Sequence, residues 1–451
     1  MKKKSICSLL LLCSLVVSLL VLPAAAAEAP ELQCRNAVLL DATYGDVLYE
    51  KAAREKAYPA SLTKVMTALL VLEALDSGVL TPDTPVTADE YAREGLNIYS
   101  STAGIKYGQT LTVEELLYCL LLPSANEAAN MLAIAVDGSA AAFVDHMNRR
   151  AAELGAKGTH FLNPHGLHDD EHYTTAYDMA LFMEEALKHD LFRTIIGSKD
   201  HRIPATDSHP EFYFYNTNAL ISNLHYRGYV YEPCIGGKTG STDEAGRCLV
   251  SAAEQGDKLL ISVVLGSGVI LDENGNQKQG QFTESTKLLK WGFSNFKRVT
   301  ITRSAEPVDK VAVTLSRQAD EVMVKPEGSI TRTLPIDMDV EDIEETITLF
   351  SDTVEAPVEE GQVLGTMTLS LGDRVYGTLD LVAVTSVERS DLLYKKAQVV
   401  EFFQTFWVRM VVVALSALVL GLLVYLLVIR KKRRYRSRYH RPHRNYRGGR
   451  R

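Results

Sequence analysis

Apolar residues in the first two thirds of the chain change their spacing several times. Two short apolar runs on either side of a glycine predict a hairpin over residues 37–49. Residues 65–72 are apolar at nearly every position, which predicts a helix buried on all sides. Further helical patterns cover 113–136 and 140–154, and strand patterns cover 234–241, 247–253 and 259–265. This order predicts an α+β domain, in which an antiparallel sheet packs with helices.

The pattern changes near residue 298. From there to residue 386, short runs alternate apolar and polar positions and are separated by glycine, proline and acidic residues. This is typical of a small all-β domain, and it carries no group of residues suited to catalysis. We therefore expect a first domain at 28–297, the all-β domain at 298–386 and a linker helix at 387–409.

Two apolar runs lie near the ends of the chain. Residues 1–27 combine three lysines, an apolar stretch and four alanines, as a cleaved signal peptide does. Residues 410–429 contain no charged residue and are long enough to cross a bilayer as a transmembrane helix. The tail at 430–451 holds twelve lysines and arginines and no acid, so the positive-inside rule places it in the cytoplasm. We expect a single-pass protein of the cell membrane with its catalytic domain outside.

The charge of the chain narrows the range of partners. The net charge is −8, and about −23 remains for residues 28–409 once the basic tail and the three N-terminal lysines are set aside. An acidic domain of this kind repels the phosphates of nucleic acids. The basic tail could be an arm that binds RNA or lipid, but a stop-transfer signal explains it more simply.

The cysteines give no clear disulfide framework. Cys34, Cys119, Cys234 and Cys248 remain after removal of the signal peptide, too few to define one in a domain of this size. Cys119 lies in an apolar helical run and is expected in the core. Cys234 and Cys248 flank one strand, but a hairpin turning near Asp243 would not place them opposite each other.

Three short motifs stand in the order needed for attack of a serine on an amide carbonyl. They are Ser61-Leu-Thr-Lys64, Ser124-Ala-Asn126 and Lys238-Thr239-Gly240. Each motif alone occurs often by chance, whereas the ordered set is specific.

The first motif combines a nucleophile with a base. Ser61 and Lys64 are three residues apart, so a helix places them on one face, and a serine in the first turn lies near free backbone amides. Lys64 can take the serine proton only if burial and a second cation lower its pKa, and Lys238 can be that cation. The alternative is a capping serine with a solvated lysine, which so apolar a helix disfavours.

The other two motifs can bind substrate and move protons. Ser124 and Asn126 could simply cap the helix that follows, or Ser124 could relay a proton to the leaving amine while Asn126 holds Lys64 and the substrate amide. Three glycines in the third strand suggest that another backbone approaches it closely, as a substrate peptide along its edge would. Lys238 and Thr239 would then face the carboxylate end of the peptide.

Longer runs around the motifs carry a family resemblance. They resemble the low-molecular-weight penicillin-binding proteins, which are serine D-alanyl-D-alanine carboxypeptidases. The runs are residues 41–51, 58–67, 120–129, 163–167 and 237–246. The resemblance covers residues 30–300 and implies a β-lactamase/transpeptidase-like fold there, and 298–386 is similar to the C-terminal domain of the family.

The resemblance also implies the roles of individual residues. It implies catalytic roles for Ser61, Lys64 and Ser124 and substrate-binding roles for Asn126, Lys238, Thr239, Gly240 and Ser241. Ser61 would be the acylated nucleophile and Lys64 its base, and the backbone amides of Ser61 and Ser241 would form the oxyanion hole. The substrates would be peptidoglycan stem peptides and the inhibitors β-lactam antibiotics, with no cofactor.

Two features depart from the family pattern. Members of the family often carry an arginine just after the strand equivalent to 259–265, where it helps to recognise the substrate carboxylate, but residues 266–269 hold none. The usual C-terminal anchor is an amphipathic helix lying on the membrane, whereas this chain is expected to span it.

The acidic loop at residues 165–172 could hold a metal ion, but the sequence favours this interpretation less than a loop without metal. His165 and His172 enclose Asp169, Asp170 and Glu171, but they lack helical or Cys/His ligand spacing, so we expect no metal there.

Three other functions share the motifs. A β-lactamase needs a group that activates the deacylating water, and no Glu-x-x-x-Asn string lies between Ser124 and Lys238. A sensor without turnover would keep every motif, and a transpeptidase or endopeptidase would differ only in the acceptor, which the sequence does not show.

Overall fold

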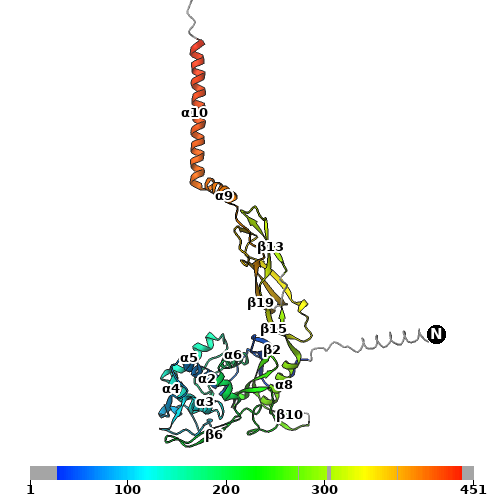
Figure 1. Cartoon of the computed structure of the whole chain (residues 1–451). Helices are drawn as coiled ribbons and strands as arrows, with labels where there is room; N and C mark the ends of the chain where they lie inside the picture. Colours follow the sequence, from blue (N-terminus) through cyan, green and yellow to red (C-terminus); the bar gives the residue numbers. More distant parts are fainter. Residues whose placement is uncertain (1–27, 273, 302–305, 373, 439–451) are drawn as a thin grey trace, which may run out of the picture. The chain divides into compact units, whose positions relative to one another are not determined.

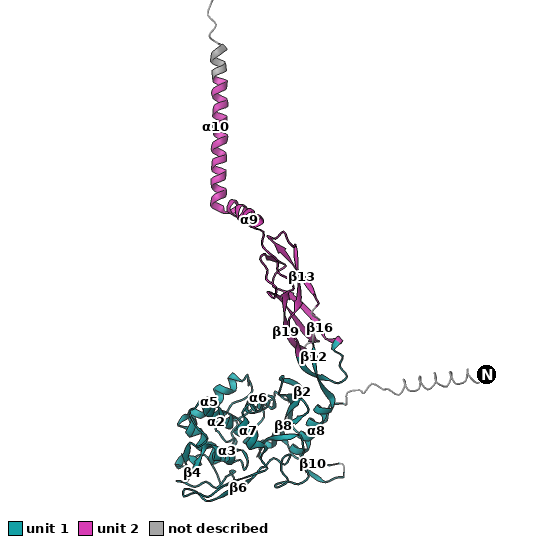
Figure 2. Cartoon of the chain, in the orientation of Figure 1, with its two compact units in different colours: residues 1–301, 331–340 teal, residues 302–330, 341–451 magenta. Residues whose placement is uncertain are grey.

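The computed structural model describes residues 28–272, 274–301, 306–372 and 374–438 (Figure 1). Two compact units can be distinguished (Figure 2). The first holds the residues up to Ile301 together with Thr331–Val340, and the second holds Thr302–Ile330 and the residues from Glu341 on. The expected signal peptide at 1–27 and the end of the basic tail, 439–451, lie outside the described residues.

The first unit is built on an antiparallel sheet with the strand order β2-β1-β9-β8-β7. Its strands are β1 (Asn36–Asp41), β2 (Asp46–Lys51), β7 (Cys234–Thr242), β8 (Gly246–Gln255) and β9 (Lys258–Ser267). The predicted hairpin and the three later strands are therefore confirmed. Strand β7 lies at one edge of this sheet, so its outer side is free of strand pairing within the described residues.

Helices cover both faces of the sheet, which explains the unbroken apolar run in β1. Ala37 and Leu39 belong to the core under helix α8 (Gly280–Asn295), whereas Val38 and Leu40 belong to the core of the helical block. Successive side chains of a strand point to opposite faces, so a strand buried on both faces is apolar at every position.

The helical block surrounds α2 (Lys64–Asp76). Its other helices are α3 (Val113–Leu121), α4 (Asn126–Asp137), α5 (Ala140–Glu153), α6 (Ala176–Ala186) and α7 (Asp190–Gly197). Ten of the thirteen residues of α2 are buried, as the apolar sequence predicts. The helical pattern of 113–136 is interrupted between Leu121 and Asn126, where Ser124 adopts a left-handed φ of 68°.

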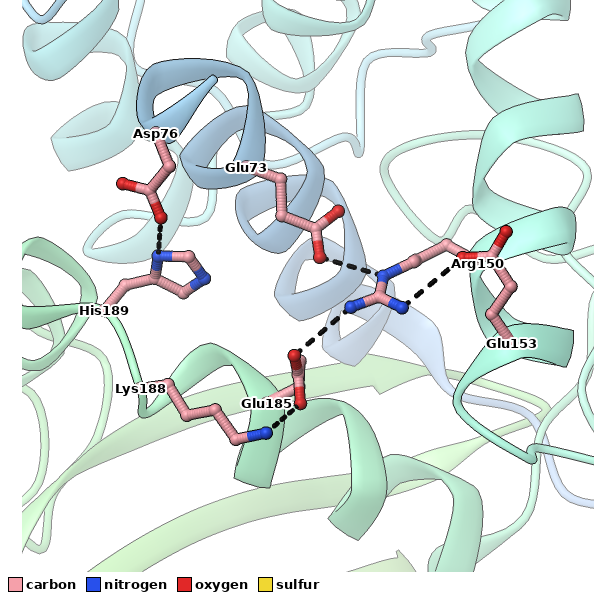
Figure 3. Close-up of polar contacts among 7 residues, drawn as sticks. All are labelled: Glu73, Asp76, Arg150, Glu153, Glu185, Lys188 and His189. Carbon is pink, nitrogen blue, oxygen red and sulfur yellow. Dashed lines mark hydrogen bonds and ion pairs between the residues drawn. The ribbon is translucent and has the colours of Figure 1, made fainter. Parts of the chain in front are cut away.

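An arginine holds three of these helices together (Figure 3). The guanidinium of Arg150 on α5 lies 2.8 Å from Glu73 on α2 and 3.2 Å from Glu185 on α6. Nearby, His189 lies 3.0 Å from Asp76 at the end of α2. These contacts fix the C-terminal end of the helix whose N-terminal end carries Lys64.

Short strand pairs and 3₁₀ turns complete the first unit. The pairs are β3 (Pro85–Thr87) with β4 (Thr110–Thr112), β5 (Asp200–Ile203) with β6 (Phe212–Tyr215), β10 (Val269–Leu271) with β11 (Gln277–Gln279), and β12 (Phe296–Ile301) with β15 (Ile330–Pro335). The 3₁₀ turns are η1 (Ala60–Thr63) and η2 (Glu90–Arg93). The cysteines of the described residues are all free and buried.

The second unit holds most of the expected all-β domain at 298–386, whereas residues 298–301 and 331–340 belong to the first unit. The described strands of the second unit form one sheet in the order β16-β18-β19-β14-β13-β17. They are β13 (Asp309–Thr314), β14 (Glu321–Pro326), β16 (Glu344–Leu349), β17 (Thr353–Glu355), β18 (Val363–Leu371) and β19 (Arg374–Ala383), with a 3₁₀ turn η3 at Val340–Asp342. Val311 and Val313 are buried while Ala312 is exposed. The alternation of apolar and polar residues in the sequence therefore indicates a sheet with one covered face.

Two helices follow the β sheet. Helix α9 covers Asp391–Gln404, and α10 covers Phe406–Arg438. An 18-residue window within residues 406–432 of α10 reaches a mean hydropathy of 3.0, and the segment is long enough to cross a membrane. Their apolar side chains are exposed in the protein alone, as a membrane anchor requires.

Candidate active site

The turn at Ala60–Thr63, called the nucleophile turn after the role expected for Ser61, lies directly before helix α2. The sequence predicted Ser61 in the first α-helical turn with Lys64, but it lies in the 3₁₀ turn η1, and α2 begins at Lys64 itself. Ala60 has a φ of 47°, an unfavourable conformation for a residue with a side chain. The strained turn still leaves Ser61 Oγ 2.9 Å from Lys64 Nζ, so the predicted pair is in contact.

Lys64 is fully buried and touches three oxygen atoms. Besides Ser61 Oγ, its Nζ lies 2.7 Å from Asn126 Oδ1 and 2.7 Å from the backbone oxygen of His165. Burial lowers the pKa of Lys64 well below its usual value, and the positive charge of Lys238 lowers it further. The side chain therefore has the surroundings of a base rather than of a surface cation.

The second and third motifs meet in a separate contact. Lys238 Nζ donates to Ser124 Oγ at 2.9 Å and to the backbone oxygen of Thr239 at 2.7 Å. Lys238 and Ser124 are both buried, and burial lowers the pKa of Lys238 to about 7. The structure thus brings the members of all three motifs together in two lysine–serine pairs.

Strand β7 passes very close to the nucleophile turn. A Cβ atom on Gly240 would lie 3.0 Å from the backbone nitrogen of Ser61 and 3.0 Å from the oxygen of Pro59. A larger residue would push the strand away from Ser61, so glycine is required for this approach. On the other face of β7, Thr239 Oγ1 lies 2.7 Å from Thr217 Oγ1, a neighbour that the sequence analysis missed.

The loop at 159–173 supports the nucleophile turn. A Cβ on Gly166 would lie 1.9 Å from the oxygen of Ala60, and His172 Nε2 is 2.9 Å from Thr63 Oγ1. Burial lowers the pKa of His165 to about 3 and that of His172 to about 4, so both rings are neutral. Among the described residues, no group of three His, Cys, Asp or Glu side chains is arranged to hold a metal ion.

Glu127 is a buried residue of the site that sequence reasoning missed. Its Oε1 accepts hydrogen bonds from the hydroxyl of Thr102 at 2.6 Å and from the backbone amides of Ala103, Gly104 and Ile105. Its negative charge also acts on the pKa of Lys64, in the direction opposite to burial. The available signal was an acid directly after Asn126 in an otherwise apolar helix start.

A cleft borders the site on the side of α4 and α5. It has a volume of about 1090 Å³ and includes Asn130 and Ile134 of α4, Val144 of α5 and His165. His165, whose backbone oxygen binds Lys64, lines this cleft, so the cleft begins close to the buried Lys64.

Comparison with known proteins agrees with this geometry. Residues 23–268 match the D-alanyl-D-alanine carboxypeptidase family, and residues 296–389 match the C-terminal domain of penicillin-binding protein 5. D-alanyl-D-alanine carboxypeptidase DacF of Bacillus subtilis is 32% identical, with 80% of this chain and 87% of the relative covered. DacC of Escherichia coli is 34% identical, with 80% and 86% covered. The crystal structure of penicillin-binding protein 5 from Haemophilus influenzae aligns with a TM-score of 0.63 at 26% identity, with 80% and 100% covered.

Both domains are thus matched, and the matched relatives are covered over most of their length. The serine–lysine pair, the approach of β7 and the homologues all lead to one conclusion: this chain belongs to the D-alanyl-D-alanine carboxypeptidase family of serine hydrolases.

Proposed function

We propose that this protein is a membrane-anchored serine carboxypeptidase that removes the terminal D-alanine from peptidoglycan stem pentapeptides. The reaction runs through an acyl-enzyme on Ser61, and β-lactams acylate the same residue. The observation that carries the proposal is the buried Lys64 Nζ, 2.9 Å from Ser61 Oγ.

Acylation uses the neutral form of Lys64. A neutral amine has two N–H groups and one lone pair. Asn126 Oδ1 and the oxygen of His165 each accept one N–H, which leaves the lone pair for the hydroxyl of Ser61. Lys64 takes the serine proton while Ser61 Oγ attacks the carbonyl carbon of the penultimate D-alanine.

The leaving amine receives its proton from the second lysine–serine pair. When the C–N bond breaks, the hydroxyl of Ser124 donates a proton to the nitrogen of the departing D-alanine. Lys238, 2.9 Å away, returns a proton to Ser124. A pKa of about 7 suits Lys238 to this exchange, because it can hold or lose the proton near neutral pH.

The developing oxyanion would be bound by the backbone amides of Ser61 and Ser241. The close approach of Gly240 to the nitrogen of Ser61 supports this assignment, because it brings the end of β7 beside the nucleophile turn. Asn126, Thr239 and Ser241 would hold the peptide along the free edge of β7.

Hydrolysis completes the cycle. Water adds to the acyl carbon and gives its proton to the now neutral Lys238, while protonated Lys64 returns a proton to Ser61 Oγ as the ester bond breaks. Both lysines then recover their starting states. An amine in place of water would give a transpeptidase, with the same residues in the same roles.

Helix α10 would anchor the enzyme in the membrane. Its uncharged part, residues 410–429, supports a single span, and the basic residues that follow support a cytoplasmic tail. The catalytic unit would then act on the outer side of the membrane.

The full-length protein in detergent tests the proposal. Incubation with labelled penicillin should modify Ser61, and mass spectrometry should show release of D-alanine from a stem pentapeptide. Ser61→Ala should abolish both, whereas Ser77→Ala, at the other end of α2, should abolish neither. Labelling at a different residue would contradict the proposal, and rapid hydrolysis of penicillin would indicate a β-lactamase.

A further inference from the structure

The negatively charged carboxylate of the proposed substrate requires a positively charged group to bind it, and the three motifs do not identify that group. A D-alanyl-D-alanine peptide carries its negative charge two bonds beyond the scissile nitrogen, so the binding group must lie next to the catalytic residues. Lys238 is poorly suited, because its Nζ already binds Ser124 and Thr239 and its pKa of about 7 leaves it only partly charged. Residues 266–269 hold no cation.

On the basis of the proposed function, we infer that Arg247 binds the C-terminal carboxylate of the peptide, in a site shared with Thr239 and the N-terminal end of α8.

The pairing of β7 with β8 places Arg247 next to the third motif. Arg247 lies directly opposite Ser241, and Leu249 lies opposite Thr239. Residues opposite each other in an antiparallel pair project to the same face, so Thr239, Ser241 and Arg247 share one face of the sheet. Lys238 and Gly240 project to the other face, toward Ser124 and Ser61. Because β7 is the edge strand of the sheet, groups from both of its faces can reach a peptide that lies along its free edge.

Arg247 is half-buried and is paired with no acid among the described residues. Its Nη1 donates to Gln279 Oε1, and no carboxylate of the described residues lies within ion-pair distance. By contrast, Arg150 and Arg193 are each paired with a glutamate at 2.7 to 2.8 Å. A partly desolvated guanidinium without a counter-charge is suited to a bidentate interaction with an incoming carboxylate.

The start of α8 adds a second feature that favours an anion. Gln279 precedes α8 and makes no capping hydrogen bond with its side chain, and the first turn contains no acid. The helix begins over the same face, because Phe282 packs with Leu249 in one apolar cluster. The positive end of a helix dipole attracts a carboxylate.

The side-chain oxygen of a buried amide in the first turn of α8 also lacks a partner within the described part of the chain. Gln281 is only 6% exposed, and its Oε1 has no hydrogen-bond partner among the described residues. A buried polar side chain left unpaired is unfavourable unless a ligand or its bound water supplies the missing contact. Gln281 lies in the turn of α8 that approaches Ser267, the β9 residue paired with Arg247, because a Cβ on Gly280 would meet Ser267 Oγ.

Two matched substrates test the inference in the full-length protein. One is a peptide ending in D-alanyl-D-alanine, and the other is the same peptide ending in D-alaninamide, which keeps the scissile bond but removes the charge. The wild-type protein should prefer the acid by about 100-fold in kcat/KM. Arg247→Gln should reduce this preference to near unity through loss of activity on the acid, and Arg247→Lys should restore part of it.

The control is Arg202→Gln, on β5, which removes an exposed arginine paired with Glu211. It should leave the preference unchanged. If Arg247→Gln fails to fold, Arg247→Lys provides the test. A lysine cannot make the bidentate contact, so its preference for the acid over the amide should be lower than that of the wild-type protein. An equal loss on both substrates, or a wild-type protein without preference, would overturn the inference. Absence of D-alanine or D-alaninamide release from either substrate by the wild-type protein would instead refute the proposed function.

Discussion

Asn126 Oδ1 lies 2.7 Å from Lys64 Nζ, and these two residues are the first residues of helices α4 and α2. The N-terminal ends of two buried helices therefore converge on one amine. Helix N-termini carry partial positive charge, which disfavours a protonated lysine just as burial does. The architecture of the helical block thus favours a neutral Lys64, the form that the proposed mechanism requires.

Replacement of Lys64 tests this base directly. Lys64→Ala should lower the rate of acylation by penicillin by about 10² to 10⁴, the range for a lost general base. Lys56→Ala, on the exposed surface before the nucleophile turn, is the matched control and should acylate at the wild-type rate. Stopped-flow labelling gives both rates, and circular dichroism checks the fold. An unchanged rate in a folded Lys64→Ala protein would remove this residue from the mechanism.

Glu127 should set the pH dependence of acylation. Its negative charge raises the pKa of Lys64 against the larger effect of burial. Besides Glu127 on α4, the groups near Lys64 are Lys238 on β7 and the neutral rings of His165 and His172. Glu127→Gln should lower the pKa of Lys64 further, so the rising limb of acylation rate against pH should move to lower pH.

The same substitution should also reduce stability. The amide that replaces the carboxylate of Glu127 would accept the hydrogen bonds of residues 102–105 without a charge, and we expect a loss of about 1 to 3 kcal/mol in the free energy of unfolding. Glu115→Gln, which removes a capping acid on the neighbouring helix α3, controls for loss of an acid without contact to Lys64. A shift of the rising limb to higher pH in Glu127→Gln would contradict the assigned electrostatic effect.

The sequence predicted the residues of the site better than the connections between them. Ser61, Lys64, Ser124 and Lys238 could be identified because their chemistry is tied to short motifs. Their distances, and the contact of Thr239 with Thr217, depend on segments far apart in the chain, which no local pattern encodes.

The strands and the buried helix were predictable for a different reason. The spacing of apolar residues along the chain indicates which positions are buried, so α2 and β7 to β9 could be located from the sequence. The left-handed φ of Ala60 was not predictable, because alanine has no preference for it and only the packing of Gly166 and β7 imposes it. The position of Arg247 likewise depends on strand register, which the sequence left open.

Lys238 should make stability depend on pH. Its pKa is lowered from 10.5 to about 7 in the folded protein, so between these values the unfolded chain binds a proton that the folded protein does not. Stability from this residue therefore rises with pH across the window from about 7 to 10.5. The melting temperature of the wild-type protein relative to Lys238→Met should increase from about pH 7 to about pH 10.

A surface variant controls for the loss of one positive charge. Lys199→Met, at an exposed position before β5, should show no such increase. Differential scanning calorimetry at matched ionic strength gives the comparison. If the difference in melting temperature between wild type and Lys238→Met falls as the pH rises, the folded protein does not disfavour the protonated form of Lys238.

Arg150 should stabilise the helical block without taking part in the chemistry. Arg150→Met would leave Glu73 and Glu185 partly buried and without their shared cation, as Figure 3 shows. We expect a loss of about 1 to 3 kcal/mol in the free energy of unfolding, less than for a fully buried pair. Arg202→Met, which breaks an exposed pair, should lose less stability than Arg150→Met. Both variants should be acylated by penicillin at rates close to wild type well below their melting temperatures.

The topology of the anchor can be tested with residues that no other prediction uses. If α10 spans the bilayer, high salt and alkaline carbonate should not extract the protein, because burial of an apolar helix does not depend on ionic attraction. Deletion of residues 409–451 should release active enzyme into the medium, whereas an anchor lying on the surface would loosen with salt. Protease added outside intact cells should remove the catalytic unit and spare a tag placed after Arg451. Loss of that tag would show that the tail lies outside, and the positive-inside orientation would then be wrong.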